Sequence, residues 1–194
     1  MSIREPFTIR QVDQYLKMAC YKQTKSLTDH YLYQALETFP IKGKQVAIFH
    51  STTPWYESIA LAQGAYPTTV HTPILSSEDS RITIDAQPKN DAFDAVWMLL
   101  HLKSVGLGAS IHLDADLEAM NEAKKLLNKT GLLYISLPVG KDRVFSHSHR
   151  VYGATRMKLL FKGWRPAGYF GYSYEDLLKE SQELHEPVIV LKPL

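Results

Sequence analysis

Apolar side chains recur at helical spacing in the first forty residues of the chain. Within residues 9–21, Val12 and Leu16 lie four positions apart on one predicted helical face, with further apolar residues near them. A second helix is predicted over residues 28–38, where Pro40 ends the pattern. We interpret these two helices as a brace or a lid that precedes the main body of the domain.

The pattern changes at residue 44, where short apolar runs begin to alternate with helical segments. The run FDAVWMLL at residues 93–100 is almost wholly apolar, as expected for a strand in the middle of a parallel sheet. Further strands are predicted at residues 44–49, 66–71, 81–84, 131–137, 165–172 and 187–192, with an irregular stretch after the fifth strand. Helices are predicted between them at residues 55–63, 114–128, 155–161 and 174–180.

This alternation predicts an α/β fold. We expect a single domain over residues 1–194, a Rossmann-like three-layer sandwich with a mostly parallel sheet of about six or seven strands. Its core is residues 44–194, and the two N-terminal helices in residues 1–40 precede it. The short connection between the last two strands allows that pair to be antiparallel. Because ligands of such sheets bind beyond the carboxyl ends of the strands, the residues that follow each strand are the first site candidates.

Composition and charge mainly exclude classes of protein and of binding partner. Of the 194 residues, 45% are hydrophobic and 22% are charged, as is usual for one soluble globular domain. The net charge of +2, without a long basic or acidic block, argues against nucleic acid as a partner. Cys20 is the single cysteine, so no internal disulfide can form. The sequence lacks both a membrane-spanning run and a signal peptide, and we expect a cytoplasmic protein.

Several phrases of the sequence resemble a known family in their order and spacing. They are HSTTPWYESIALAQGA followed by TTV, then GLG, DADLEAM, LLNKTGLLYISLPVGKDRVF and HRVYG. They resemble the family catalogued as domain of unknown function number 268, which is similar to class I S-adenosylmethionine-dependent methyltransferases. The resemblance runs from about residue 46 to residue 170. It implies a Rossmann-like fold with S-adenosylmethionine as the cofactor.

A methyl donor site of this kind implies a tight turn after the first strand, an acidic residue after the second and a polar residue after the third. By this resemblance, Ser51, Thr52 and Thr53 supply the turn, and Asp85 contacts the adenine edge. The other residues assigned to cofactor binding are His50, His71, Ala86 and His101. A simpler interpretation of the turn stays open, because Ser and Thr commonly cap a helix that starts near a proline such as Pro54.

Three departures from the family's pattern fall at this predicted cleft. His50 stands where the family has glycine, so a β-carbon and an imidazole lie where the backbone would approach the ligand. His71 replaces the family's acidic residue, and the loss of a charge-assisted hydrogen bond weakens binding roughly tenfold to a hundredfold. The family's Ser-Ser-x-Glu-His run reads Leu-Leu-His-Leu-Lys at residues 99–103. The sequence therefore indicates a retained fold with an altered site.

The phrase HRVYG supplies the candidate catalytic residues, which are His149, Arg150 and Tyr152. The resemblance implies that they form a cluster near the cleft. His149 is a candidate base, because an unperturbed histidine titrates near neutrality. Arg150 has two interpretations: it grips an acidic group of the substrate, or it makes a buried pair with a carboxylate such as Asp114 or Asp116.

Other polar side chains are open to a functional or a plain interpretation. His101 and Lys103 are either a replacement acid–base pair or solvated loop residues. His147 and His149 alternate on an extended segment, but a metal site needs a third ligand that nothing in the sequence places beside them. No metal site is therefore predicted.

Two functions from different classes remain open at this point. The leading hypothesis is S-adenosylmethionine-dependent methyl transfer to an oxygen or nitrogen of a small molecule or glycan. The rival is a degenerate methyltransferase fold without catalysis that serves as a binding or scaffold protein. A nicotinamide-binding enzyme is disfavoured because the first turn is not rich in glycine. The placement of His50 and Asp85 discriminates between the first two functions, and a homodimer is compatible with either.

Overall fold

A computed structural model describes residues 5–72, 74, 76–180 and 185–194, so residues 1–4 of the predicted N-terminal segment lie outside it. The helices are α1 (Ile9–Cys20), α2 (Leu27–Thr38), α3 (Trp55–Ala62), α4 (Ala115–Leu126), α5 (Ala154–Leu160) and the 3-10 helix η1 (Tyr174–Leu178). The strands are β1 (Gln45–Phe49), β2 (Tyr66–Val70), β3 (Thr83–Asp85), β4 (Phe93–Met98), β5 (Leu127–Ser136), β6 (Arg143–Phe145), β7 (His149–Val151), β8 (Trp164–Phe170) and β9 (Val188–Pro193). None of the helices in these described ranges is long and apolar enough to cross a membrane.

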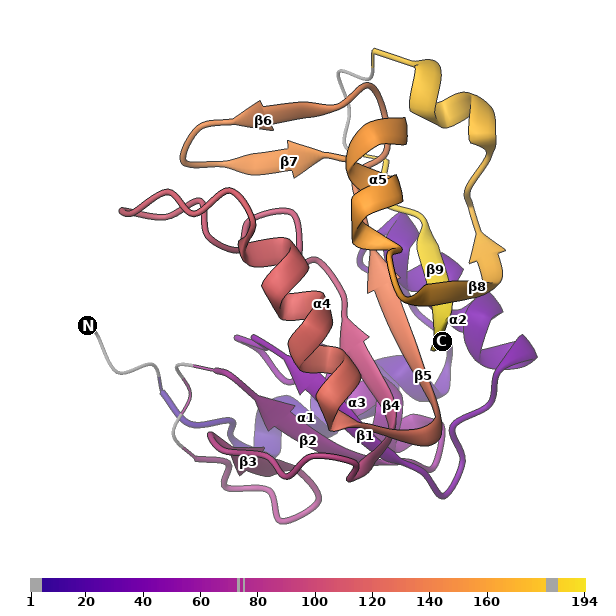
Figure 1. The fold of residues 1–194 in the computed structure, drawn as a ribbon. Coiled ribbons are helices and arrows are strands. Elements are labelled where there is room, and N and C mark those ends of the chain that lie inside the picture. Colours follow the sequence, from indigo (N-terminus) through magenta and orange to yellow (C-terminus); the bar gives the residue numbers. More distant parts are fainter. Residues whose placement is uncertain (1–4, 73, 75, 181–184) are drawn as a thin grey trace.

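Seven strands form one sheet in the order β3-β2-β1-β4-β5-β9-β8. The strands from β3 to β5 in this order are parallel, whereas β9 runs antiparallel to both of its neighbours. This sheet confirms the predicted fold class, and its last pair is antiparallel, as the short connection allowed. In Figure 1 the arrows of β4 and β5 point toward the end of the molecule that carries β6 and β7.

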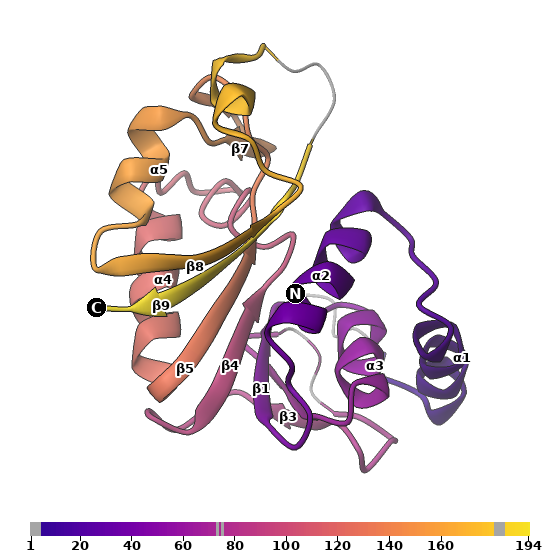
Figure 2. The same ribbon diagram turned by 90° about the vertical axis from the view of Figure 1, so that its right-hand side faces the viewer.

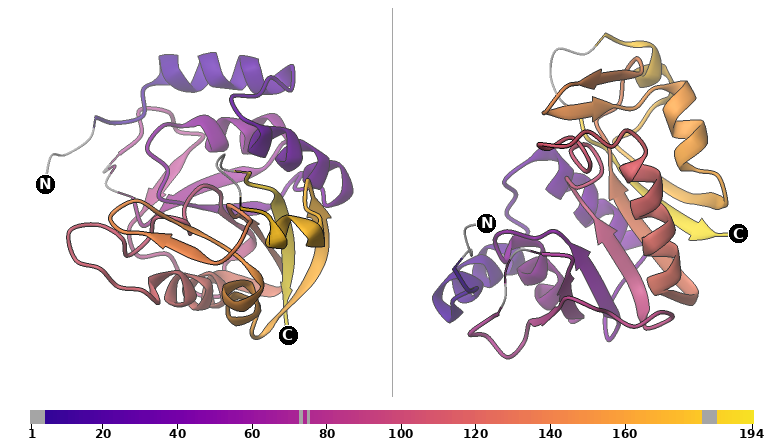
Figure 3. Two further views of the ribbon diagram at one scale, coloured as in Figure 1. Left: turned by 90° about the horizontal axis from the view of Figure 1, so that it is seen from above. Right: turned by 60° about the vertical axis from the view of Figure 1, so that its left-hand side comes forward.

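Helices cover both faces of the sheet. Figure 2 shows α4 and α5 on one face and α1, α2 and α3 on the other, and Figure 3 shows α1 and α4 on opposite sides of the molecule. Successive strand residues point to opposite faces. Ala47 and Phe49 of β1 therefore pack in the cluster that includes Met120 of α4, whereas Val46 and Ile48 pack against α2 and α3. This double burial explains why the central strands are apolar at almost every position.

The helix α2 begins at a cap that the sequence supplies. The Ser26 hydroxyl accepts the backbone N–H of Asp29, and the Asp29 carboxylate accepts the N–H groups of Lys25 and Ser26. Farther along α2, the ring of Tyr31 lies against Gly171, just beyond β8. Such contacts would fix α2 against the sheet, as a brace requires. Whether the N-terminal helices act as a brace or as a lid stays a prediction.

A two-stranded hairpin occupies part of the stretch that the pattern predicted to be irregular. Residues Arg143–Phe145 pair antiparallel with His149–Val151. All of β6 is exposed, so the hairpin lacks the alternation of buried and exposed positions that predicts a strand. The backbone N–H of Arg150 donates to the carbonyl of Lys103, which joins the hairpin to the loop that follows β4.

Candidate functional site

A pocket lies at the carboxyl ends of the adjacent strands β1 and β4. From β1 the chain continues to β2 on one side of the sheet, and from β4 it continues to β5 on the other, which is where ligands bind in such sheets. Its volume is about 540 Å³. Three segments line it, namely the start of α2, the turn from β1 into α3, and the loop after β4. The lining residues are Lys25, Ser26, Asp29, Trp55, Tyr56, Ser104 and residues 49–53 and 99–101. The pocket therefore joins the predicted first turn to the N-terminal helices.

The turn from β1 into α3 uses its serine internally. His50 has a left-handed backbone with φ of +54°. The Ser51 hydroxyl donates to the Thr53 carbonyl at 2.8 Å and to the Glu57 carboxylate at 2.9 Å, and the Thr72 hydroxyl donates to the Ser51 carbonyl. A helix cap accepts a backbone N–H, whereas the Ser51 hydroxyl donates to acceptors inside the turn, and α3 starts without a side-chain cap. The structure therefore does not support the capping interpretation of Ser51. Thr52 and Thr53 are exposed and line the pocket.

Three imidazoles gather around Phe49 at this edge of the sheet. The rings of His50 and His101 lie 4.8 Å apart between centroids, and Phe49 lies 5.0 Å from His71 and 5.7 Å from His101. His101 is only 8% exposed. Burial, with smaller contributions from His50 and His71, lowers the pKa of His101 to about 3. The His101 ring is therefore neutral near neutral pH and a weak proton acceptor.

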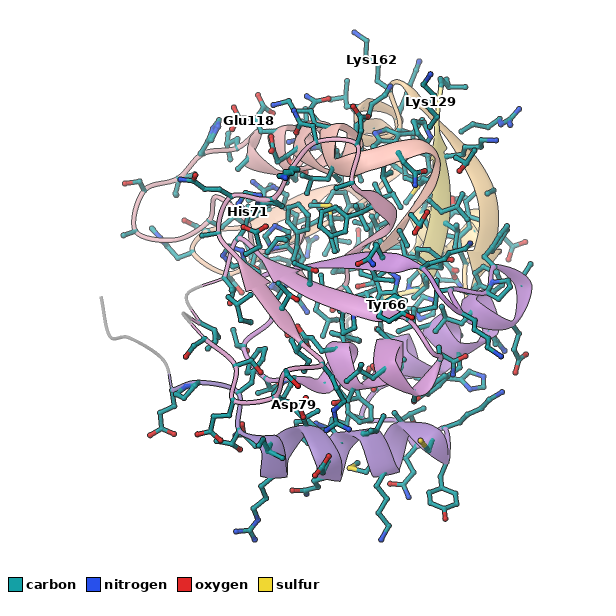
Figure 4. All side chains as sticks on the ribbon, turned by 90° about the horizontal axis from the view of Figure 1, so that it is seen from below. Tyr66, His71, Asp79, Glu118, Lys129 and Lys162 are labelled. Carbon is teal, nitrogen blue, oxygen red and sulfur yellow. The ribbon has the colours of Figure 1, made fainter. Side chains whose placement is uncertain are left out.

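The predicted cofactor residues divide into two groups. His50, Ser51, Thr52, Thr53 and His101 line the pocket, whereas His71, Asp85 and Ala86 do not. Figure 4 shows His71 and Tyr66 at opposite ends of β2, so His71 does stand at the carboxyl edge. Its Nε2 atom is buried without a hydrogen-bond partner in the described residues. The Asp85 carboxylate accepts the backbone N–H of Gln87 within its own loop.

These positions test whether S-adenosylmethionine fits in the manner that the resemblance implies. The donor would need open space from the first turn to the ends of β2 and β3. Instead, the His50 ring lies 4.8 Å from that of His101 at a tilt of 31°, and the half-buried His71 stands where the resemblance implies a carboxylate for the ribose hydroxyls. The residues present do not fit the donor in that binding mode.

A buried carboxylate lies beneath the turn. Glu57 is fully buried and accepts hydrogen bonds from the hydroxyls of Thr69 at 2.7 Å and Ser51 at 2.9 Å. Burial raises the pKa of Glu57 from its ordinary 4.5 to about 7, against the lowering effect of these hydrogen bonds. Because Glu57 does not line the pocket, we assign it to the support of the turn.

Glu57→Gln is expected to remove a pH dependence of stability. The folded protein binds this proton more tightly than the unfolded chain, so Glu57 favours folding most below pH 4.5, and that contribution is lost as pH rises through 7. The change corresponds to roughly 2–3 kcal/mol. Urea unfolding between pH 5 and pH 8 measures it, as the difference between the wild type and the variant. The partly exposed Glu122→Gln is the control, and an unchanged slope in the Glu57 variant would contradict the expectation.

Two of the candidate catalytic residues lie in the interior. Arg150 is 2% exposed and Tyr152 is fully buried. The Tyr152 hydroxyl lies 2.9 Å from the Leu102 carbonyl and 3.1 Å from the Asp116 carboxylate, and Arg150 Nε lies 3.8 Å from the same carboxylate. The Arg150 guanidinium also donates to the backbone carbonyls of Leu102, Val105, His112 and Leu113. Both side chains hold the loop after β4, and their catalytic role stays a prediction.

The histidines of the hairpin have other partners. The His149 ring stacks on Phe145 at 4.6 Å, and its Nδ1 lies 2.8 Å from the Ser148 hydroxyl. His147 Nδ1 lies 2.9 Å from the Gly108 carbonyl. His149 is not a lining residue of the pocket, so the structure does not bring the predicted base to the predicted turn. In the part of the chain that the structure describes, no three His, Cys, Asp or Glu side chains gather as metal ligands.

Sequence reasoning missed the pocket residues that come from α2 and α3. Lys25, Asp29 and Tyr56 all line the pocket. The one signal for Asp29 was its place three residues after Ser26, which predicts a helix cap rather than a ligand site. Tyr56 follows Trp55 in a plain amphipathic helix. Only the packing of α2 beside α3 brings these side chains together.

Comparisons with known proteins support the fold. Residues 43–190, most of the chain, match the model of a family described as "Caenorhabditis protein of unknown function, DUF268". This match confirms the resemblance carried by the sequence phrases. A comparison with curated proteins gives no match.

Solved structures share the architecture at low sequence identity. The 1,6-didemethyltoxoflavin-N1-methyltransferase of Burkholderia thailandensis, with bound 1,6-didemethyltoxoflavin and S-adenosylhomocysteine, is 16% identical with a TM-score of 0.57, covering 95% of this chain and 81% of that one. The methyltransferase CcbJ of Streptomyces caelestis is 11% identical with a TM-score of 0.57, covering 86% and 90%. The cyclase SpnF is 13% identical with a TM-score of 0.58, covering 100% and 99%. These likenesses show the methyltransferase-like α/β fold and nothing about the reaction.

Proposed function

We propose, from the premise that this chain belongs to the DUF268 family, that it uses a methyltransferase fold to bind a small molecule in the pocket between β1 and β4. In this proposal the chain does not transfer a methyl group from S-adenosylmethionine. The family's fold is kept, while the carboxyl edge of the sheet serves binding in place of catalysis.

The observation that carries the proposal is the contact between the tilted rings of His50 and His101. The ring centroids lie 4.8 Å apart at the ends of β1 and β4, where strand order reverses in the sheet. The methyl donor would have to pass through this place from the first turn toward β4. The pocket is lined by both rings and by residues at the start of α2, and it does not reach Asp85. A ligand can therefore enter without displacing the imidazoles, whereas the donor cannot adopt the family's pose.

The chemistry of the pocket also favours binding over catalysis. His101 is a weak base because burial lowers its pKa to about 3, and Glu57 is fully buried beneath the turn. His149, Arg150 and Tyr152 do not line the pocket. Arg150 and Tyr152 act on it only indirectly, because they hold the loop after β4. The side chains that remain can orient a ligand and exclude water from it.

A second function is S-adenosylmethionine-dependent methyl transfer to a small molecule or glycan. Its support is the left-handed backbone at His50, which keeps the turn that glycine forms in the family. The solved structure from Burkholderia thailandensis, with S-adenosylhomocysteine bound, has the same fold. In this case the His50 and His101 rings would have to separate when the donor binds.

Calorimetry with S-adenosylmethionine and S-adenosylhomocysteine separates the two functions. The wild type is expected to show no binding at ligand concentrations up to about 1 mM. The double variant His50→Gly, His71→Glu restores the family's residues and is expected to gain at least about tenfold in affinity for S-adenosylhomocysteine. Glycine also suits the φ of +54° at position 50, so the first substitution does not strain the turn.

The control for this experiment changes residues away from the pocket. His147→Gly with Glu118→Gln alters a histidine and a carboxylate that do not line it, and is expected to leave binding unchanged. Micromolar binding of S-adenosylhomocysteine by the wild type would overturn the proposal in favour of methyl transfer.

A further inference from the structure

A second pocket, of about 350 Å³, lies between the hairpin of β6 and β7, the end of the loop that precedes α4, and α5. Figure 1 shows these three parts of the chain at one end of the molecule. The second pocket shares no lining residue with the pocket between β1 and β4, so it is a separate site from that of the proposed function. We infer that it binds an amphiphilic anion, whose carboxylate pairs with Arg143 and whose apolar tail lies against the pocket wall.

Apolar side chains from three parts of the chain form the wall of the second pocket. Leu113 precedes α4, Val144 belongs to β6 and Leu159 belongs to α5. These side chains are 57%, 50% and 49% exposed. One exposed apolar side chain is ordinary, but three that converge on one hollow form an apolar patch that a ligand can cover. The volume of the hollow suits a small molecule, since ligand pockets usually measure about 300–1,000 Å³.

Three arginine side chains line the second pocket, and two of them are already held by the protein. Arg150 is buried beneath the loop, where its guanidinium donates to backbone carbonyls. Arg156 donates from Nη1 to Asp114 at 2.9 Å and from Nε to Asp116 at 3.1 Å. These two guanidinium groups therefore build the floor of the pocket and do not select its ligand.

Arg143 is the guanidinium that is left for a ligand. It is exposed on β6, and its side chain makes no hydrogen bond or ion pair with the described residues. Its guanidinium carbon lies 5.5 Å from the ring centroid of Phe145. The hydrogen bond from Lys141, at 2.9 Å, and the weaker attraction of Arg143 lower the pKa of Glu180. Since Glu180 bonds to Lys141, the donors of Arg143 can bind a carboxylate with two parallel hydrogen bonds.

Asp142 is the one carboxylate that lines the second pocket, and its oxygens already have donors. Its Oδ1 atom accepts the backbone N–H groups of Gly153 at 2.8 Å and Arg156 at 3.1 Å, and its Oδ2 atom accepts that of Thr155 at 2.9 Å. Burial opposes the ionisation of Asp142, but these hydrogen bonds outweigh it and lower the pKa. A cationic ligand would thus find no unused carboxylate among the lining residues, whereas an anion finds Arg143.

Three probes with the same tail test the inference: octanoate, octanol and octylamine. They place an anion, a neutral hydroxyl and a cation on one apolar chain. Calorimetry at pH 7 is expected to show octanoate binding at least about fivefold more tightly than octanol, and octylamine binding more weakly than octanol. Acetate, which has the carboxylate without the tail, is expected not to bind. Equal affinities for octanoate and octanol, or no binding of octanoate at about 1 mM, would overturn the inference and leave the proposed function standing.

Two variants assign the binding to the second pocket. Arg143→Met keeps the length of the side chain without its donors, so octanoate is expected to bind no more tightly than octanol, while octanol binding stays the same. Leu159→Asp places a carboxylate in the apolar wall and is expected to weaken octanoate binding at least about tenfold. Both side chains are exposed, so we expect both variants to fold, which thermal unfolding checks.

Matched controls change the same residue types away from the second pocket. Arg165→Met on β8 and Leu178→Asp on η1 alter exposed residues that do not line it, and both are expected to leave octanoate binding unchanged. Unchanged octanoate affinity in either folded variant, Arg143→Met or Leu159→Asp, would place the binding elsewhere and contradict the inference.

Discussion

Arg150→Met is expected to lower the free energy of unfolding by about 3–5 kcal/mol. The guanidinium is 2% exposed and donates to four backbone carbonyls in the loop after β4, the shortest bond being 2.6 Å to Val105. Methionine has a similar length but no donors, so all four carbonyls lose the guanidinium. The carbonyls of Leu102, His112 and Leu113 keep only the hydrogen bonds from Tyr152, Ala115 and Arg156. The Asp116 carboxylate, 3.8 Å from Arg150 Nε, also loses a compensating charge and is left with Arg156 and Tyr152.

Chemical denaturation of the wild type and the variant measures this loss. Arg143→Met is the control, because Arg143 lies on the exposed strand β6 of the same hairpin and is expected to change stability by less than about 1 kcal/mol. Similar losses of stability in both variants would show that the buried Arg150 guanidinium does not hold the loop.

Gly171→Ala is expected to destabilise the protein by about 2–4 kcal/mol, the second large effect. Two costs combine at this position. The backbone φ is +73°, a conformation that alanine adopts at a cost of roughly 1 kcal/mol. A β-carbon would also overlap the ring of Tyr31 on α2, and relief of such an overlap in a packed site costs roughly 1–3 kcal/mol.

Gly43→Ala isolates the first of these costs. Gly43 has the same φ of +73°, but a β-carbon there meets no atom within 4 Å. Its expected loss is therefore about 1 kcal/mol. Thermal or urea unfolding of the two variants measures the difference that the Tyr31 contact makes. Equal losses would mean that α2 moves without cost, as a lid would, whereas the larger loss at Gly171 supports the brace.

The helices and strands were predictable because their signals are local. The cap at Ser26, the proline after α2 and the apolar run of β4 each act within a few residues of the element that they define. The hairpin of β6 and β7 escaped prediction because its strands are only three residues long, β6 is wholly exposed, and the two strands pair only with each other. Strand order was beyond the local pattern, since it depends on which strands pair across the sheet.

The candidate site was predictable only where it follows the strands. The rule that ligands bind beyond strand ends led to His50, Thr52, Thr53 and His101, which the pocket does bring together. The same rule led to Asp85, which the pocket does not reach. The HRVYG phrase identified Arg150 and Tyr152 as a unit, but register in the hairpin decided that their side chains point into the protein beneath the loop.

The sequence by itself determined the α/β fold and the family, because these depend on residue type and spacing, and the resemblance predicts that His50 and His71 stand in place of a glycine and a carboxylate. The tertiary structure alone decided that the imidazoles of His50 and His101 lie against each other, and that Asp29 and Tyr56 meet at the pocket. The physical reason is that satisfaction of a polar atom is a property of its three-dimensional neighbours. A carboxylate in a helix cap has the same local sequence whether or not its second oxygen finds a partner across the fold.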